Sequence, residues 1–256
     1  MVAAIAAAPS RADQVSFDSP IVLSNTKTAG AWSIDRKAPA GFSSQEIAPD
    51  GTTNTLKQSI SAGDYESDPA RAFYNTQGRA YGLAPETYAA QIDVYVDSSW
   101  NTSGTAAAPV RLAGFWGVGL DASSAVSDYP ILEVVGAAGD FAVRTWDSNG
   151  TGSWSDLTLV SSNTWHTLGY SLAGGQFTYT LDGTVIGTVA SDPGTVGIGS
   201  VILQGYNNGL SYDIHWNNLE TAAVPEPASL ATIVVSLGLG GLYAARRKRR
   251  TAEAQA

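Results

Sequence analysis

Carboxylate pairs are the first candidates for chemistry in this sequence. Glycoside hydrolases act through two carboxyl groups, one as the acid and the other as the base or nucleophile. Glu66 and Asp68 hold alternate positions in GDYESDPARAFY, as two carboxylates on one face of a strand would. No third acid continues this series, and Pro69 follows at once. Proline does not suit a central strand. We therefore interpret both as loop carboxylates, and the sequence predicts no catalytic residue.

Histidine and serine give no complete reactive pattern either. His166 and His215 are isolated, with no spacing relation that would favour a metal site. The sequence holds no Gly-x-Ser-x-Gly nucleophile elbow and no dinucleotide fingerprint. We therefore expect no metal site and no cofactor.

Calcium is the one ion that the sequence leaves open. The run from Asp147 to Gly152 carries oxygen donors at alternate positions, like the first half of a calcium loop. Thr158 stands at the twelfth position, where such a loop needs a bidentate glutamate. A plain surface loop is the interpretation that we prefer, with calcium binding possible but not located.

Three tryptophans are candidates for binding a glycan. Trp100 lies in DSSWNTSG, and Trp146 and Trp154 flank DSNGTGS. An exposed indole ring in such a loop can stack on the face of a sugar. The alternative is that these rings cover the ends of a core, because tryptophan is usually mostly buried.

The elements that must position these residues read as short strands. In QFTYTLD the apolar Phe177, Tyr179 and Leu181 alternate with polar residues, which is typical of a strand with one buried face. Gly174-Gly175 and Asp182-Gly183 are hairpin signals. About a dozen such runs occur, ARAFYNT among them, and none shows a helical period. The sequence predicts an all-β, two-sheet antiparallel jelly-roll sandwich over residues 13–222.

The segment NTWHTLGYSLAGGQFTYTLDGTVIGT adds a resemblance. It is similar to the late hairpins of concanavalin A-like lectin/glucanase domains, including laminin-G-like ones, with Trp165, Tyr170, Tyr179 and Asp182-Gly183 in the matching places. The resemblance implies a jelly roll that hosts binding modules, glycosidases and lyases alike. Lyases of this shape use Arg, Gln, His and Tyr, and Gln91-Ile92-Asp93 lacks their histidine.

The C-terminal segment has a different character. Leu230 to Ala245 is an uncharged run of 16 residues, about 24 Å as a helix and short for a bilayer core of about 30 Å. A stop-transfer cluster follows it, which the positive-inside bias places in the cytoplasm: Arg246, Arg247, Lys248, Arg249 and Arg250. We expect a single C-terminal transmembrane helix, with the preceding chain outside the inner membrane.

Pro225-Glu226-Pro227 stands just before this run. The order of motif, apolar helix over 230–245 and basic tail over 246–250 resembles the PEP-CTERM sorting signal of Gram-negative bacteria. The resemblance implies that 223–256 is a sorting signal, that the partner is an exosortase-type membrane protease, and that the protein reaches the cell surface or an exopolysaccharide and biofilm matrix. A simple membrane anchor is the alternative.

The N-terminus and the overall charge fit export. Residues 1–12 look like the remnant of a signal peptide without its basic region. Between Asp13 and Glu226 lie 22 of the 23 acidic residues and 8 of the 14 basic ones, a net charge of −14 that repels nucleic acid. The chain has no cysteine, so disulfides are excluded.

These observations lead to an expected function. We expect an exported, non-catalytic protein of the cell surface or extracellular matrix, not an enzyme, with a weak capacity to bind polysaccharide. A divergent polysaccharide hydrolase or lyase is one alternative. A self-associating structural surface protein, recognisable by an exposed edge strand or a large apolar patch, is the other.

Overall fold

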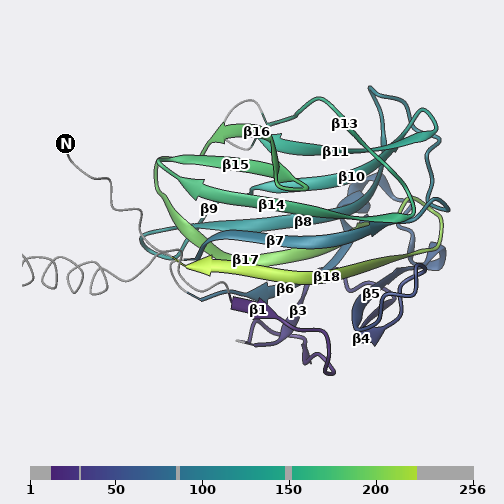
Figure 1. The fold of residues 1–256 in the computed structure, drawn as a ribbon, viewed down its shortest axis with the longest axis horizontal. Coiled ribbons are helices and arrows are strands. Elements are labelled where there is room, and N and C mark those ends of the chain that lie inside the picture. The colour runs from purple at the N-terminus through teal and green to yellow at the C-terminus, as the bar shows by residue number, and fades with distance from the viewer. Residues whose placement is uncertain (1–12, 29, 85–86, 148–151, 224–256) are drawn as a thin grey trace, which may run out of the picture. The chain divides into compact units, whose positions relative to one another are not determined.

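The computed structural model describes residues 13–28, 30–84, 87–147 and 152–223, which form a β-sandwich (Figure 1). The predicted remnant at 1–12, the sorting motif, the apolar run and the basic tail lie outside the described residues. Within the described part of the chain, no helix has the length and apolar character needed to cross a membrane.

The first sheet has eight strands. Along the sheet their order is β16 (Thr184–Ala190), β15 (Gln176–Leu181), β14 (Thr164–Ala173), β7 (Thr87–Val96), β18 (Tyr212–Ala223), β5 (Thr55–Ile60) and β4 (Gly41–Glu46), with β1 (Asp13–Val15) paired to β18. The last strand of the described chain, β18, therefore lies in the middle of the sheet, between β7 and β5.

The second sheet has ten strands. Their order is β12 (Ser153–Trp154), β11 (Asp140–Asp147), β10 (Ile131–Ala137), β8 (Val110–Asp121), β17 (Thr195–Tyr206), β6 (Thr76–Gly82), β3 (Trp32–Arg36) and β2 (Leu23–Ser24); β13 (Thr158–Val160) pairs with β11 and β9 (Val126–Asp128) with β8. The penultimate strand, β17, again lies centrally, between β8 and β6.

The main core fills the space between the two sheets. Trp32 and Trp216 are among its fully buried side chains, each worth about 1.5–3 kcal/mol of transfer free energy. Phe115 of one sheet stacks on Tyr170 of the other, with ring centroids 4.8 Å apart. The Tyr170 hydroxyl is buried without a hydrogen-bond partner among the described residues, and burial raises its pKa well above the usual value.

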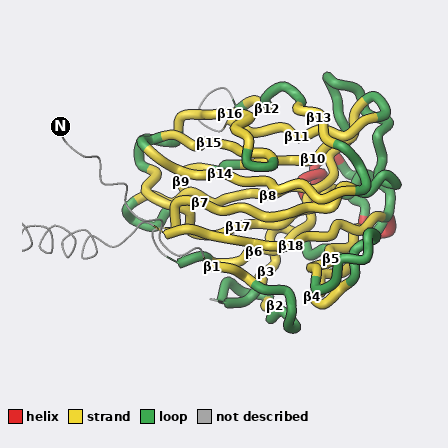
Figure 2. The backbone as a smooth tube through the Cα atoms, viewed as in Figure 1, coloured by secondary structure: helices red, strands yellow, loops and turns green. Residues whose placement is uncertain are grey.

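The predicted all-β sandwich is confirmed, and so are its two hairpins. Gly174 and Gly175 join β14 to β15 with φ of 57° and 74°, and Asp182 and Gly183 join β15 to β16 with φ of 51° and 75°. Positive φ at both central residues matches the twist of the paired strands. Figure 2 shows the described backbone as strand and loop with only short helical segments.

One predicted strand is wrong. ARAFYNT lies mainly in a 3-10 helix, η2 (Pro69–Asn75), which follows the single turn η1 (Ala62–Asp64). Asp68 caps η2 by accepting a hydrogen bond from the Ala70 amide at 2.9 Å, and Pro69 supplies the preset φ of its first position. The cap and the proline therefore outweigh the strand propensity of the two aromatic residues.

Candidate functional site

The ten-stranded sheet buries side chains on both of its faces. Leu112 and Phe115 on β8 belong to the main core, whereas Trp116 belongs to a separate cluster. Because side chains alternate along a strand, this second cluster lies on the face that points away from the other sheet, which we call the outer face. Its buried apolar members are Ala80, Trp116, Val118, Ile131 and Ile202, packed against Leu120, Trp146 and Trp154.

A row of mostly polar residues crosses the same face at the level of Gly114, which lies two positions before Trp116 on β8. The row runs through Arg144, Glu133, Gly114, Gln204, Gly78 and Asp35, on strands β11, β10, β8, β17, β6 and β3. Arg111, Trp116 and Tyr206 lie beside it on β8 and β17. We call Arg111, Trp116, Glu133, Arg144, Gln204 and Tyr206 the outer-face cluster.

Glu133 is held between two arginines. Its Oε1 accepts from Arg111 Nε at 2.6 Å, and its Oε2 accepts from Arg144 Nη2 at 2.6 Å and Nε at 3.0 Å. The Glu133 side chain is 3% exposed and that of Arg144 is 9% exposed. Both carboxylate oxygens are thus committed to guanidinium groups, so Glu133 can position the arginines but has no oxygen free to serve as an acid.

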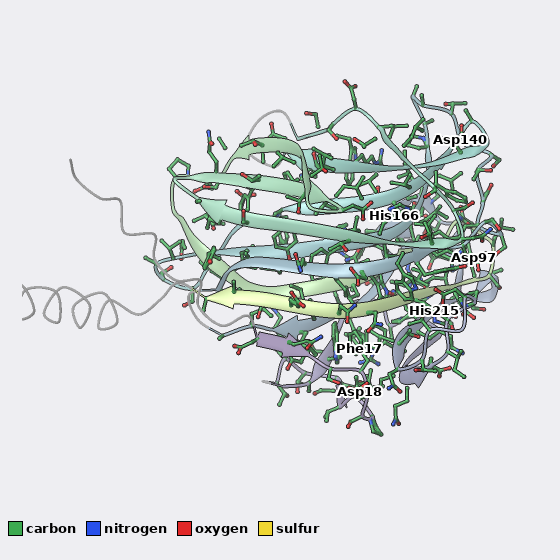
Figure 3. All side chains as sticks on the ribbon, viewed as in Figure 1. Phe17, Asp18, Asp97, Asp140, His166 and His215 are labelled. Atoms are coloured by element: carbon green, nitrogen blue, oxygen red, sulfur yellow. The ribbon has the colours of Figure 1, made fainter. Side chains whose placement is uncertain are left out.

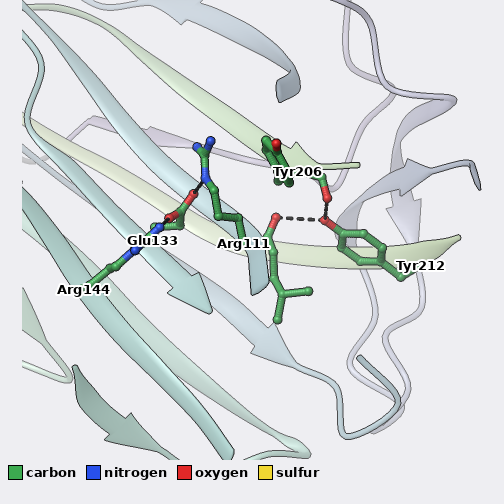
Figure 4. Close-up of polar contacts among 6 residues, drawn as sticks. Arg111, Glu133, Arg144, Tyr206 and Tyr212 are labelled. Atoms are coloured by element: carbon green, nitrogen blue, oxygen red, sulfur yellow. Dashed lines mark hydrogen bonds and ion pairs between the residues drawn. The ribbon is translucent and has the colours of Figure 1, made fainter. Parts of the chain in front are cut away.

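Arg111 and Tyr206 leave polar atoms free beside this ion pair. The Arg111 guanidinium lies 4.4 Å from the centre of the Tyr206 ring. Figure 4 shows its two terminal nitrogens pointing away from Glu133 on the Tyr206 side. Within the described part of the chain, neither these nitrogens nor the Tyr206 hydroxyl has a hydrogen-bond partner.

Tyr212 fixes the backbone that carries these two residues. Its hydroxyl lies 2.9 Å from the carbonyl oxygen of Leu112 and 2.8 Å from that of Tyr206, so it ties β8 to β17 next to Arg111. Burial raises the pKa of this phenol far above its usual value. Tyr212 is therefore a neutral structural donor and takes no part in proton transfer.

Two further groups of the outer-face cluster are buried without partners. Trp116 Nε1 and Gln204 Oε1 have no hydrogen-bond partner among the described residues, although Trp116 is only 7% exposed and Gln204 only 2% exposed. Gln204 Nε2 donates to Asp35 Oδ2 at 2.8 Å. Buried polar groups without partners are uncommon in folded proteins, so these two groups are candidates for contact with a ligand.

The three candidate tryptophans separate into two groups. Trp146 and Trp154 lie on paired strands at one end of the outer face, with ring centroids 5.0 Å apart, and the Arg144 guanidinium lies 3.9 Å from the Trp154 ring. Trp100 is 4% exposed in the core, where its indole donates to the Asp213 carbonyl at 2.9 Å. Trp100 is therefore unsuited to stacking on a sugar.

The two histidines do not meet. Both lie on the eight-stranded sheet, where β7 separates β14 from β18, as Figure 3 shows. His166 shares the inward face with Leu168, whereas His215 alternates with the core residue Trp216 and faces outward. His166 Nδ1 lies 2.8 Å from Asp182 Oδ2, and His215 Nδ1 lies 3.1 Å from Thr55 Oγ1.

Other candidate side chains are engaged locally. Glu66 pairs with the exposed Arg71 at 3.3 Å, and Asp93 accepts from Thr167 at 2.6 Å and Asn218 at 2.7 Å. Among the described residues no three His, Cys, Asp or Glu side chains are grouped to hold a metal ion. Most of the loop weighed for calcium, 148–151, lies outside the described residues.

Sequence reasoning missed the outer-face cluster, although signals for it exist. Glu133 is a single charge in the apolar run ILEVVG, and Arg144 is a single charge in FAVRTW. A charge inside a fully buried strand needs a partner. What the sequence did not supply was the pairing of β8, β10 and β11, which brings these charges side by side.

Comparison with known proteins gives the fold and no family. No family model matches the chain, and no curated protein matches it. A GlcNAcα1-4Gal-releasing endo-β-galactosidase from Clostridium perfringens has a similar structure, with a TM-score of 0.53, 11% identity and coverage of 87% of this chain and 64% of that one.

Two further solved structures have lower scores. A sialidase gives a TM-score of 0.49 at 12% identity over 77% of this chain, which spans 17% of the sialidase. A Bacillus licheniformis β-glucanase gives 0.43 at 10% identity, over 84% of this chain and 98% of the other. The endo-β-galactosidase shares the fold of this chain, so the predicted concanavalin A-like jelly roll is confirmed at the level of the fold.

The expectation that the chain is not an enzyme is contradicted. It rested on the absence of a complete catalytic motif in the sequence. A solved structure that shares the fold, the endo-β-galactosidase, is an enzyme. The outer face also carries polar groups without partners that the sequence motifs did not show.

Proposed function

We propose that the protein cleaves a polysaccharide that contains uronic acid, by β-elimination, on the outer face of the ten-stranded sheet. The observation that carries the proposal is the meeting of Arg111 and Tyr206, both with free polar atoms, on two paired strands. A cation to hold a carboxylate and a phenol to move a proton are what such a reaction needs.

The charge of this face supports an acidic substrate. Arg111 and Arg144 lie on it, although the chain between Asp13 and Glu226 carries a net charge of −14. The free terminal nitrogens of Arg111 present the fork that matches a carboxylate in a bidentate pair. Trp146 and Trp154 continue the face beyond Arg144 and offer aromatic rings to the neighbouring sugars of an extended chain.

Hydrolysis by a carboxylate pair fits this geometry poorly. Glu133 is committed to two arginines, and the next carboxylate along the row is Asp35. Four strand spacings separate these residues, about 19 Å at about 4.8 Å per strand. Glycoside hydrolases need carboxyl groups roughly 5–9.5 Å apart.

The elimination step balances without any co-reactant. Arg111 binds the carboxylate of the uronic acid and stabilises the charge that develops as the C5 proton leaves. Tyr206, as the phenolate, takes that proton, a C4=C5 double bond forms, and the glycosidic C4–O bond breaks. The phenol then returns the proton to the departing oxygen, so that no water is consumed and the phenolate is restored.

The test is cleavage of alginate, pectate and a neutral β-glucan by the full-length protein. Elimination predicts that ultraviolet absorbance of the unsaturated product rises together with new reducing ends. New reducing ends without that absorbance would show hydrolysis, and no new ends from any of the three would remove the proposal. Tyr206→Phe should lower the rate by about 100-fold or more, because proton transfer by a positioned group contributes this much. Tyr88→Phe removes a hydroxyl from β7 of the other sheet and is the matched control.

We also propose that the protein is exported and sorted to the cell surface or extracellular matrix by an exosortase-type protease. Pro225-Glu226-Pro227, the apolar run and the basic tail support this, together with the acidic composition of the preceding chain. Intact mass of the protein recovered from its native cells tests it. A chain ending near Pro225–Pro227 is the expected result, and a membrane-bound chain that still carries Arg246–Arg250 would contradict it.

A further inference from the structure

Trp116 and Gln204 present one unused donor and one unused acceptor on the same face. The Trp116 indole N–H can only donate, and it has no acceptor within the described chain. Gln204 could in principle present either end of its amide. Its Nε2 donates to Asp35 Oδ2 at 2.8 Å, and Asp35 is a carboxylate that only accepts, so the free atom must be Oε1.

Gly114 brings these two groups together. The register places Gly114 directly opposite Gln204 on β17. A Cβ atom at Gly114 would lie 2.7 Å from Trp116 Nε1 and 3.7 Å from Gln204 Cβ. The edge of the indole that carries the N–H therefore lies over the bare backbone of Gly114, next to the Gln204 side chain.

A donor beside an acceptor selects one class of ligand group. A carboxylate could accept from the indole but would be repelled by Gln204 Oε1, and an ammonium group would have the opposite conflict. A hydroxyl donates one hydrogen bond and accepts others, so it satisfies both groups at once. An O-acetyl group in the same place could only accept and would leave Gln204 Oε1 buried without a partner, which is costly.

We propose that Trp116 and Gln204 read a free hydroxyl group of the glycan bound on this face. The proposal rests on the proposed function for the nature of the ligand and adds a determinant of specificity to it. Asp35 is a positioning residue, because its bond to Nε2 holds the amide with Oε1 available. Glycans that carry an unmodified hydroxyl at this position bind, and those with it acetylated bind poorly.

Arg36 lies over the Trp116 ring. Its guanidinium lies 5.0 Å from the centre of the Trp116 ring, and the side chain is exposed. Among the described residues it makes no hydrogen bond and no ion pair. A cation–π contact of this kind at a surface is weak, so a sugar can displace Arg36 and reach the two groups.

The experiment measures binding by the full-length Tyr206→Phe protein, in which the ligand is not consumed. The probes are alginate and pectate oligosaccharides, each unmodified and chemically O-acetylated, titrated by calorimetry. Trp116→Phe, added to Tyr206→Phe, removes the indole N–H and keeps an aromatic ring. Trp165→Phe is the matched control, since its indole donates to Asp50 at 2.8 Å on the other sheet. Thermal unfolding of each protein verifies that it is folded.

The expected result is a loss of about tenfold in affinity for the unmodified oligosaccharide in Trp116→Phe, as expected when a buried group loses its hydrogen bond. Acetylation should weaken binding to the parent by a similar factor, because the acetyl group leaves Gln204 Oε1 without a donor, although it can still accept from the indole N–H. Trp165→Phe should bind like the parent. Binding that is equal with and without the indole N–H would overturn this inference alone. The absence of binding by the parent, with no cleavage by the unmodified protein, would overturn the proposed function as well.

Discussion

Replacing Glu133 by glutamine tests how much the stability depends on the buried ion pair. Glutamine keeps the size of the side chain but removes the charge that Arg111 and Arg144 share. The Arg111 side chain is 28% exposed and can turn toward water, whereas that of Arg144 is 9% exposed and is left as an uncompensated buried cation. Breaking a buried pair on one side costs about 3–5 kcal/mol.

This loss is large relative to the stability of a domain, which is typically about 5–15 kcal/mol. For a domain of this size each kcal/mol shifts Tm by about 2–4 °C, so we expect Glu133→Gln to lower Tm by about 10 °C. Urea and thermal unfolding followed by tryptophan fluorescence measure it. Glu66→Gln is the matched control, because its partner Arg71 is 60% exposed and such a surface pair contributes about 0–1 kcal/mol.

A second variant separates the lost charge from a general disturbance of packing. In Glu133→Gln with Arg144→Met no buried charge is left unpaired, and methionine can pack against Trp154, which Arg144 now contacts. Replacing a buried ion pair by apolar groups is often neutral, so most of the lost Tm should return. The reasoning would be refuted if Glu133→Gln cost no more than Glu66→Gln, or if the double variant were as unstable as Glu133→Gln alone.

Three further predictions have defined outcomes. Burial lowers the pKa of His215, so the unfolded chain binds this proton more readily. Stability should be full above about pH 6.5 and fall below it, and His215→Gln should flatten the dependence of Tm on pH between about 7.5 and 5.5; an equally steep loss in the variant would contradict this. Tyr170→Phe removes a buried hydroxyl that has no partner among the described residues, and it should leave Tm unchanged or raised. Tyr179→Phe loses the 2.9 Å hydrogen bond to the Trp146 carbonyl and should lower the free energy of unfolding in urea by about 1 kcal/mol. A larger loss in Tyr170→Phe than in Tyr179→Phe would contradict this. Arg36→Ala uncovers Trp116 and should strengthen oligosaccharide binding in calorimetry, where weaker binding would make Arg36 a ligand contact instead.

The strand pattern of the fold could be predicted from sequence because it depends on residues that are neighbours in the chain. Phe177, Tyr179 and Leu181 alternate with polar residues, and all three are buried. Gly174 and Gly175 have the positive φ that a tight hairpin turn requires. Local capping explains the main error, since Asp68 and Pro69 start a 3-10 helix where aromatic residues suggested a strand.

The candidate site could not be predicted because it depends on pairing between distant strands. Gln204 and Asp35 are 169 residues apart in sequence and 2.8 Å apart in space. In a strand that is buried on both faces, the sequence also shows no alternation of apolar and polar residues. Phe115 and Trp116 are adjacent and both apolar, but their side chains lie on opposite faces of the sheet. Trp146 and Trp154 lie on the outer face, whereas Trp100, selected by the same reasoning, is a core residue.

The placement of β17 and β18 has a consequence for the order in which the protein can fold during its synthesis. Both strands come last in the described chain, and each lies in the middle of its sheet. Until β17 has been made, up to Tyr206, β8 has no link to β6, and until β18 has been made, up to Ala223, β7 has no link to β5. Before these points each sheet exists only as two separate parts. Such non-local pairing makes folding slow, and a ribosome-bound chain ending before Thr195 should remain sensitive to protease. The two sheets can therefore be completed only after the last two strands have been made.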